Sequence, residues 1–136
     1  MCERSQNLLT IRPPFAMTTL SDSMSFDEWF QNKTLRPVIK LQNDLFLAVF
    51  RNYIKKHKDT YYGLGHEKKL KYIENAIQKD IKFRNALKGM IIGQFTLEEY
   101  GQYITNSSAL NKRMMNMVIE RLKDQIQFFD HAAIAV

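Results

Sequence analysis

The chain has 136 residues and a formal net charge of +6, from 20 Lys or Arg against 14 Asp or Glu. This length fits one domain that buries a core without disulfides or a structural metal. The single cysteine excludes an intrachain disulfide and a cysteine-based zinc site. Residues 1–20 lack the apolar segment of a signal peptide, and the apolar runs are too short to span a membrane. We therefore expect a cytoplasmic protein.

The first segment, residues 1–24, is a mixed stretch rich in Ser, Thr, Arg and Pro. Pro13 and Pro14 interrupt it, and consecutive prolines are typical of turns and loops. We therefore expect an irregular N-terminal arm over residues 1–24, followed by a single helical domain over residues 25–136. Few glycines and prolines, together with many Lys, Leu, Ile, Met, Gln and Asn residues, favour helix in that domain.

The first helices of the domain are marked by a capping box and a proline. Ser25 and Glu28 stand three residues apart, a spacing at which each side chain satisfies a free N–H group at a helix start. They predict a short helix to about Lys33. Pro37 predicts the start of a long helix to about Lys58, because a missing N–H does little harm in a first turn.

The middle of the domain contains one junction that the sequence does not decide. Residues 59–65 include Gly63 and Gly65 and predict a loop, and a helix follows from about Glu67. Asp80 leaves two alternatives open. Either it caps a separate helix that extends to about Ile92, or the preceding helix continues through it.

The last third of the chain predicts two more helices. Thr96 and Glu99 form a second capping-box pattern, which predicts a short helix to about Ile104 or Thr105. Residues 106–108, Asn-Ser-Ser, end that helix and cap the last one. Because no segment shows strand-like alternation, the chain predicts an all-α fold, a bundle of about four main helices with short connecting helices.

Positive charge is concentrated between Arg51 and Lys88. This basic window holds eleven Lys or Arg against four Asp or Glu, so the rest of the chain carries a net charge of −1. Its basic residues recur at helical spacing on two faces, which we expect to form a groove for an acidic partner. The alternative is an ordinary solvated helix surface. The residues predicted to contact the partner are Arg51, Lys55, Lys58, Tyr61, Tyr62, Lys68, Lys71, Lys79 and Lys82.

No residue pattern predicts catalysis, a cofactor or a metal site, and His57, His66 and His131 lack the spacing of metal-binding pairs. The basic window favours a non-enzymatic regulatory or adaptor protein that docks on an acidic protein or ribonucleoprotein. An inhibitor of a nucleic-acid-processing enzyme fits this description. One alternative is direct RNA or DNA binding without sequence preference. A second is an enzyme with a site between Tyr61 and Lys68, where Tyr, His and Lys side chains cluster.

The last helix carries more apolar positions than one helix face holds. Met114 and Met115 lie on different faces, and methionine suits adaptable contact surfaces. A domain of this size has a limited core to cover them, although core filling is the alternative for Met114 and Met117. We therefore expect a homodimer that also uses the apolar tail over residues 132–136. Its predicted interface residues are Met114, Met115, Met117, Ile119 and Phe129.

Overall fold

The computed structural model describes residues 1–14 and 20–129, and within these ranges the chain consists of helices and turns without a β-strand. The α-helices are α1 (Glu3–Ile11), α2 (Phe26–Phe30), α3 (Arg36–Leu41), α4 (Asn43–Lys56), α5 (His66–Lys79), α6 (Ile81–Ile92), α7 (Leu97–Tyr103) and α8 (Ser107–Asp124). A π-helical turn, η2 (Gln31–Leu35), joins α2 to α3, and a 3-10 turn, η3 (Thr60–Gly63), follows α4. The predicted all-α fold class is confirmed. No helix in the described ranges has the length and apolar content that a bilayer crossing requires.

Polar side chains start several helices where the sequence predicts them. At α7 the Thr96 hydroxyl accepts the Glu99 N–H (3.1 Å) and the Glu99 carboxylate accepts the Thr96 N–H (2.9 Å), which completes the capping box. At α2, within the described residues, only the first of these bonds forms, from the N–H of residue 28 to Ser25 Oγ (3.2 Å). Asp80 decides the open alternative, because its carboxylate accepts the Phe83 N–H (3.2 Å) and α6 begins there as a separate helix.

The helix predicted from Pro37 to about Lys58 is interrupted, so the prediction of one continuous helix is wrong. Gln42 separates α3 from α4 and has a turn-like backbone (φ −87°, ψ 2°). Its side chain donates a hydrogen bond to the Met90 carbonyl oxygen of α6 (2.9 Å), which holds this bend against the neighbouring helix. The second half, α4, ends at Lys56.

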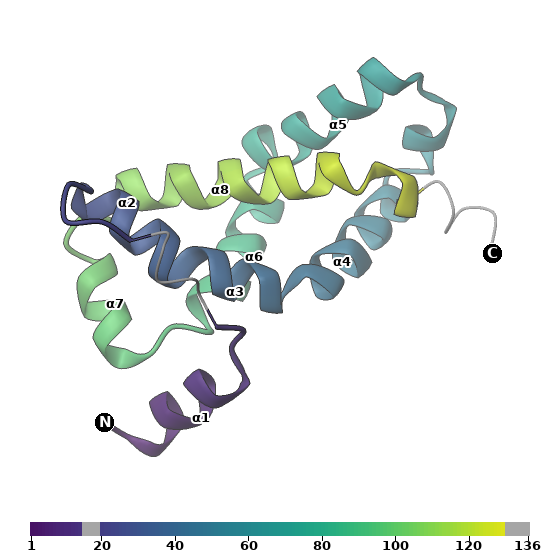
Figure 1. Cartoon of the computed structure of the whole chain (residues 1–136). Coiled ribbons are helices and arrows are strands. Elements are labelled where there is room, and N and C mark those ends of the chain that lie inside the picture. The colour runs from purple at the N-terminus through teal and green to yellow at the C-terminus, as the bar shows by residue number, and fades with distance from the viewer. Residues whose placement is uncertain (15–19, 130–136) are drawn as a thin grey trace.

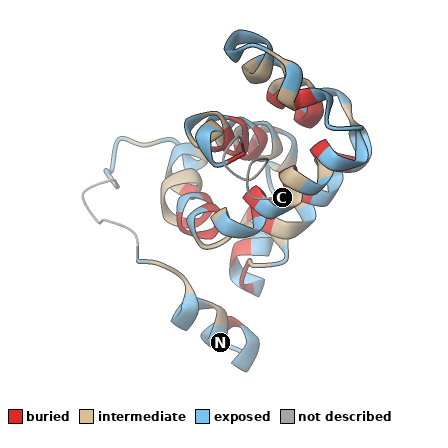
Figure 2. Ribbon diagram, turned by 90° about the vertical axis from the view of Figure 1, so that its right-hand side faces the viewer, coloured by how far each residue is buried: buried red, intermediate tan, exposed pale blue. Residues whose placement is uncertain are grey.

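The core lies around α8, which packs against α5, α6 and η2 and runs the length of the molecule (Figure 1). Past the end of α8, Phe129 lies 4.9 Å from the ring centroid of Phe50 on α4, and Phe50 also meets the rings of Tyr61 (6.0 Å) and Phe83 (6.3 Å). Buried residues line the facing sides of the helices, while the outward sides are exposed (Figure 2). Burial of each such large side chain contributes about 1.5–3 kcal/mol to folding.

The N-terminal arm differs from the irregular segment that the sequence predicts, because part of it forms the helix α1. This helix lies beside the corner between α6 and α7 (Figure 1). Arg4 donates hydrogen bonds to the carbonyl oxygens of Gly93 (2.9 Å) and Phe95 (2.8 Å), and Ser5 Oγ accepts the first N–H of α7 (3.3 Å). A cation at the carbonyl end of α6 is favoured by the helix dipole. These tertiary contacts explain why part of the arm is helical although its local sequence does not predict a helix.

Glu99 is the central residue of this contact. Its carboxylate accepts hydrogen bonds from Arg12 (2.6 Å), the Thr34 hydroxyl (3.1 Å) and the Thr96 N–H, and the Arg12 and Glu99 side chains are 6% and 10% exposed. Burial raises the pKa of Glu99, but the hydrogen bonds from Arg12 and from the Thr96 backbone lower it by more, so this pKa lies below its ordinary value. We name this group of residues the N-terminal clasp: Arg4, Ser5, Arg12 and Glu99.

Candidate functional site

A groove of about 970 Å³ opens between the end of α4 and the junction of α5 with α6. We call it the basic groove and define it by its lining residues, Tyr53, Lys56, His57, Lys58, Thr60, Tyr72, Asn75, Ala76, Lys79, Asp80, Ile81 and Lys82. All of them lie inside the basic window that the sequence singles out. The lysines come from α4, from the turn after it, from α5 and from α6, so the groove assembles charges that are distant along the chain.

Two chain reversals position these lysines. After α4, Lys58 and Asp59 adopt left-handed backbone conformations (φ 63° and 57°) and turn the chain into η3. This conformation costs a residue with a side chain roughly 1–2 kcal/mol. At Asp80 the backbone is extended (φ −88°, ψ 99°), which ends α5 and starts α6. As a result Lys79 and Lys82 lie on two different helices that flank the same groove.

The lysines of the basic groove have no ion-pair partner among the described residues. All four are exposed, and none of them forms an ion pair within the described ranges. The acidic side chain in the lining, Asp80, has both oxygens engaged by the fold. One accepts the N–H that starts α6, and the other accepts the Tyr53 hydroxyl (3.1 Å). The positive potential of the groove is therefore left for a partner to neutralise.

Tyr61 and Tyr62 lie differently from the prediction that they contact a partner. Tyr61 is fully buried, and its ring meets that of Phe50 edge-on. Tyr62 is half-buried with its ring against that of Tyr61 (5.6 Å between centroids). In the sequence, tyrosines beside many basic residues are typical of a loop that contacts a partner. Here the apolar area of the rings is covered by the core instead, because that burial stabilises the fold.

Tyr53 and Tyr72 form the half-buried part of the groove lining. Tyr53 stacks on the exposed His57 ring (4.1 Å), and burial, followed by the hydrogen bond to Asp80, raises the pKa of Tyr53 to about 12. Burial also raises the pKa of Tyr72, whose hydroxyl has no hydrogen-bond partner among the described residues. Both hydroxyls stay protonated at neutral pH, so the charge of the groove comes from its lysines.

The groove contains some of the predicted partner residues and adds others. The predicted residues that line it are Lys58, Lys79 and Lys82. Those that are exposed outside it are Lys55, Lys68 and Lys71. Arg51 is half-buried and donates a hydrogen bond to the Phe128 carbonyl oxygen (3.2 Å). Helical spacing misses Lys56 and His57, which lie at the end of α4 and line the groove without sharing the predicted face of Arg51, Lys55 and Lys58.

The residues predicted to form a dimer interface lie mostly in the core of the chain itself. Met114, Met115, Ile119 and Phe129 are buried, and Met117 is half-buried. The apolar positions cover more than one face because α8 has α5, α6 and η2 around it. This burial removes the argument on which the homodimer prediction rests. The apolar tail over residues 132–136 lies outside the described residues.

The stretch between Tyr61 and Lys68 places its reactive groups in different surroundings. Tyr61 is buried, whereas His66 and Lys68 are exposed in the first turn of α5. The ammonium group over the Tyr61 ring is that of Lys69 (5.2 Å). Among residues 1–14 and 20–129, no three His, Cys, Asp or Glu side chains converge as ligands for a metal ion.

Comparison with known proteins adds no family to these observations. No protein-family model, no curated protein and no solved structure matches the chain. The clues to function are therefore the charge, shape and hydrogen bonds of this chain itself, and the basic groove is the strongest of them.

Proposed function

We propose that this protein is a non-enzymatic regulatory or adaptor protein that docks its basic groove on an acidic protein or ribonucleoprotein partner. The observation that carries the proposal is the set of four exposed lysines around one groove, with no acidic partner in the described chain. Charges of one sign that the fold gathers without neutralising them attract and orient an oppositely charged partner. The proposal includes a cytoplasmic location, where the single free cysteine stays reduced.

The aromatic rings favour an acidic protein surface over free nucleic acid. Proteins that bind single strands without sequence preference stack the bases on aromatic side chains. Here Tyr61 is buried, and the Tyr53 ring packs between His57 (4.1 Å) and Phe83 (4.3 Å). Lysine ammonium groups are compact charges on flexible stems, and they pair with carboxylates and phosphates alike. Direct RNA or DNA binding is therefore the alternative that an experiment has to separate.

The test uses one variant with four charge reversals in the groove: Lys56→Glu, Lys58→Glu, Lys79→Glu and Lys82→Glu. A matched control reverses four exposed lysines outside it: Lys55→Glu, Lys68→Glu, Lys71→Glu and Lys112→Glu. Fluorescence anisotropy measures binding of a labelled polyglutamate peptide, a single-stranded RNA and a DNA duplex of similar charge. We expect polyglutamate binding that weakens as salt rises, and a loss in the groove variant at least about tenfold larger than in the control.

Two outcomes would overturn the proposal. An equal loss in both variants would mean that net charge alone attracts the peptide and that the groove is not a site. Tighter binding of RNA or DNA than of polyglutamate, lost only in the groove variant, would establish direct nucleic-acid binding instead. Thermal melting accompanies each measurement, because exposed substitutions change stability by less than about 0.5 kcal/mol each and both variants should stay folded.

A further inference from the structure

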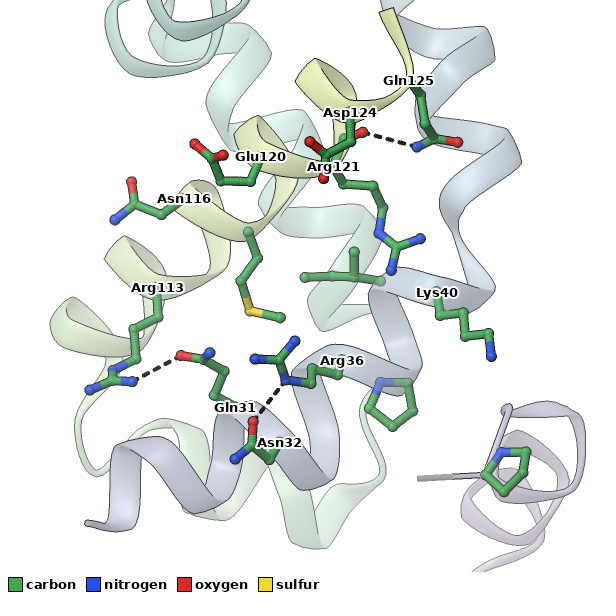
Figure 3. Close-up of a pocket in the computed structure, with 14 residues that line it drawn as sticks. Gln31, Asn32, Arg36, Lys40, Arg113, Asn116, Glu120, Arg121, Asp124 and Gln125 are labelled. Atoms are coloured by element: carbon green, nitrogen blue, oxygen red, sulfur yellow. Dashed lines mark hydrogen bonds between the residues drawn. The ribbon is translucent and has the colours of Figure 1, made fainter. Parts of the chain in front are cut away.

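A second hollow, of about 780 Å³, lies between η2, α3 and α8 (Figure 3). We call it the arginine hollow, after the lining residues Arg36, Arg113 and Arg121. It shares no lining residue with the basic groove. Its volume falls within the range of small-molecule sites, about 300–1,000 Å³. A hollow of this size has room for a compact ligand.

The three arginines are held in place by neutral groups. Arg36 donates a hydrogen bond to the amide oxygen of the Asn four residues earlier (2.8 Å). Arg113 donates to the amide oxygen of Gln31 (2.9 Å), and Arg121 donates to that of Asn43 (3.4 Å). Within the part of the chain that the structure describes, none of the three forms an ion pair. An amide oxygen orients a guanidinium without cancelling its charge and leaves most of its five N–H donors available.

Two of these arginines face the same space. The Arg36 side chain reaches from α3 toward α8, and the Arg121 side chain reaches from α8 toward α3 (Figure 3). Glu120, an acidic residue of the lining, points away from Arg36 in this view and lies 3.8 Å from Lys123. The lining as a whole carries four basic side chains, Arg36, Lys40, Arg113 and Arg121, against two acidic ones, Glu120 and Asp124. The hollow therefore keeps a net positive charge, and its guanidinium groups suit an oxyanion.

An apolar surface adjoins these charges. Pro37, Ile39 and Met117 contribute to the lining, and Ile39 is buried beneath it. A methionine thioether adapts its shape to a ligand and makes favourable contacts with aromatic rings. The combination of oriented guanidinium groups and an adaptable apolar wall selects for a ligand with an anionic end and an apolar body.

From these features we infer that the arginine hollow binds a small phosphate monoester with an aromatic body. The phosphate oxygens accept hydrogen bonds from the guanidinium groups of Arg36 and Arg121, because the paired N–H donors of a planar guanidinium match two phosphate oxygens. The aromatic body lies on Met117 and Pro37. This inference does not depend on the proposed function, because the basic groove is formed by other residues.

Isothermal titration calorimetry tests it with phenyl phosphate, inorganic phosphate and phenol as probes. We expect phenyl phosphate to bind more tightly than either fragment. A variant with Arg36→Gln and Arg121→Gln should lose at least about tenfold in phenyl phosphate affinity, since two charge-assisted contacts are removed. The matched control, Lys68→Gln with Lys112→Gln, removes the same charge from exposed positions outside the hollow and should bind as the wild type does.

A second pair of substitutions separates fork geometry from charge. Arg36→Lys with Arg121→Lys keeps the positive charge but loses the paired N–H donors, so it should also weaken phenyl phosphate binding. If the glutamine variant does not fold, this lysine variant provides the test in its place. The inference is overturned if phenyl phosphate shows no saturable binding up to about 10 mM, if both variants bind unchanged, or if inorganic phosphate binds equally well. The variant with four charge reversals in the basic groove should retain phenyl phosphate binding. A failure of the inference about the arginine hollow is therefore distinct from a failure of the proposed function.

Discussion

The N-terminal clasp and the basic groove use charge in opposite ways. In the clasp, the side chains of Arg12 and Glu99 are almost fully covered, paired with each other and hydrogen-bonded to the backbone. In the groove, the lysines are exposed and meet no acidic side chain of the described chain. A buried pair matters for the stability of the fold, because removal of one partner leaves the other charge buried without a counter-ion. An exposed cluster costs the fold little and stays available to another molecule. Burial and pairing, rather than charge itself, separate the structural role of the clasp from the binding role proposed for the groove.

This comparison predicts its largest effect for Glu99→Ala. The substitution leaves the Arg12 guanidinium buried without a counter-ion and removes the acceptor for Thr34 and for the Thr96 N–H. The free energy of unfolding, measured by urea denaturation, should fall by about 3–5 kcal/mol. Because the two residues act together, Arg12→Ala with Glu99→Ala should lose less than the sum of the single losses. A loss below about 1 kcal/mol for Glu99→Ala would contradict the structural role of the clasp.

The same carboxylate predicts sensitivity to acid. The pKa of Glu99 is lower in the folded state than in the unfolded state, so the unfolded chain binds the proton more readily. Its stabilisation is complete well above the ordinary Glu pKa of about 4.3 and is lost as the pH falls through the folded-state pKa. Glu99→Gln should therefore flatten the dependence of unfolding free energy on pH below about pH 5.

Glu74 is the matched control for this pH effect. The Lys123 ammonium hydrogen-bonds to Glu74 and lowers its pKa too, but the pair lies nearer the solvent. Glu74→Gln should change the pH profile less than Glu99→Gln, because solvent screens the interaction. An equal change in the two profiles would argue that burial adds nothing to the clasp.

For the groove the comparison predicts a small effect on folding. The fourfold glutamate variant at Lys56, Lys58, Lys79 and Lys82 should change the free energy of unfolding by less than about 0.5 kcal/mol for each substitution. The physical reason is that all four side chains are exposed and none is paired within the described residues. Urea denaturation of this variant beside Glu99→Ala gives the direct contrast, and a loss of several kcal/mol would mean that these lysines also hold the fold.

The smallest effect is expected for Tyr72→Phe in the groove lining. This buried hydroxyl has no partner among the described residues, so its removal takes away an unsatisfied polar group and leaves the ring packing intact. Stability should stay the same or rise by up to about 1 kcal/mol. The matched control is Tyr53→Phe, which loses the hydrogen bond to Asp80 and should cost roughly 0.5–1.5 kcal/mol. Equal losses in the two variants would show that the Tyr72 hydroxyl is satisfied after all.

Candidate helix starts can be read from this sequence because a cap is a local event, although only the structure decides that Asp80 starts a separate helix. Thr96 and Glu99 satisfy each other's N–H groups within one turn, and Asp80 needs only the N–H three residues later. The ion pair of Glu99 with Arg12 cannot be predicted from the local sequence, because Arg12 lies near the other end of the chain. The order of α1 is missed for the same reason, since its contacts lie on the corner between α6 and α7.

The candidate site is predictable in its region but not in its members. Charge density identifies the stretch of chain that lines the groove. Periodicity along one helix, however, groups Lys79 with Lys82, which the break at Asp80 places on separate helices. The sequence predicts that Tyr61 contacts a partner, whereas in the structure its ring is buried in the core. On α8, several neighbours rather than a second copy cover the apolar positions such as Met115. Each difference comes from tertiary packing, which a single sequence encodes only indirectly.

The separation of Arg12 and Glu99, 87 positions along the chain, also bears on the order of folding. Closing so long a loop has an entropic cost that is offset only once α6 and α7 are already in place. We expect the contacts of α1 to form after the rate-limiting step, because they need the corner between α6 and α7 to be in place. A substitution in the clasp accordingly speeds unfolding and leaves the folding rate nearly unchanged. We then expect the first turns of the chain to govern how long the folded state lasts, and the helices around α8 to govern how quickly it is reached.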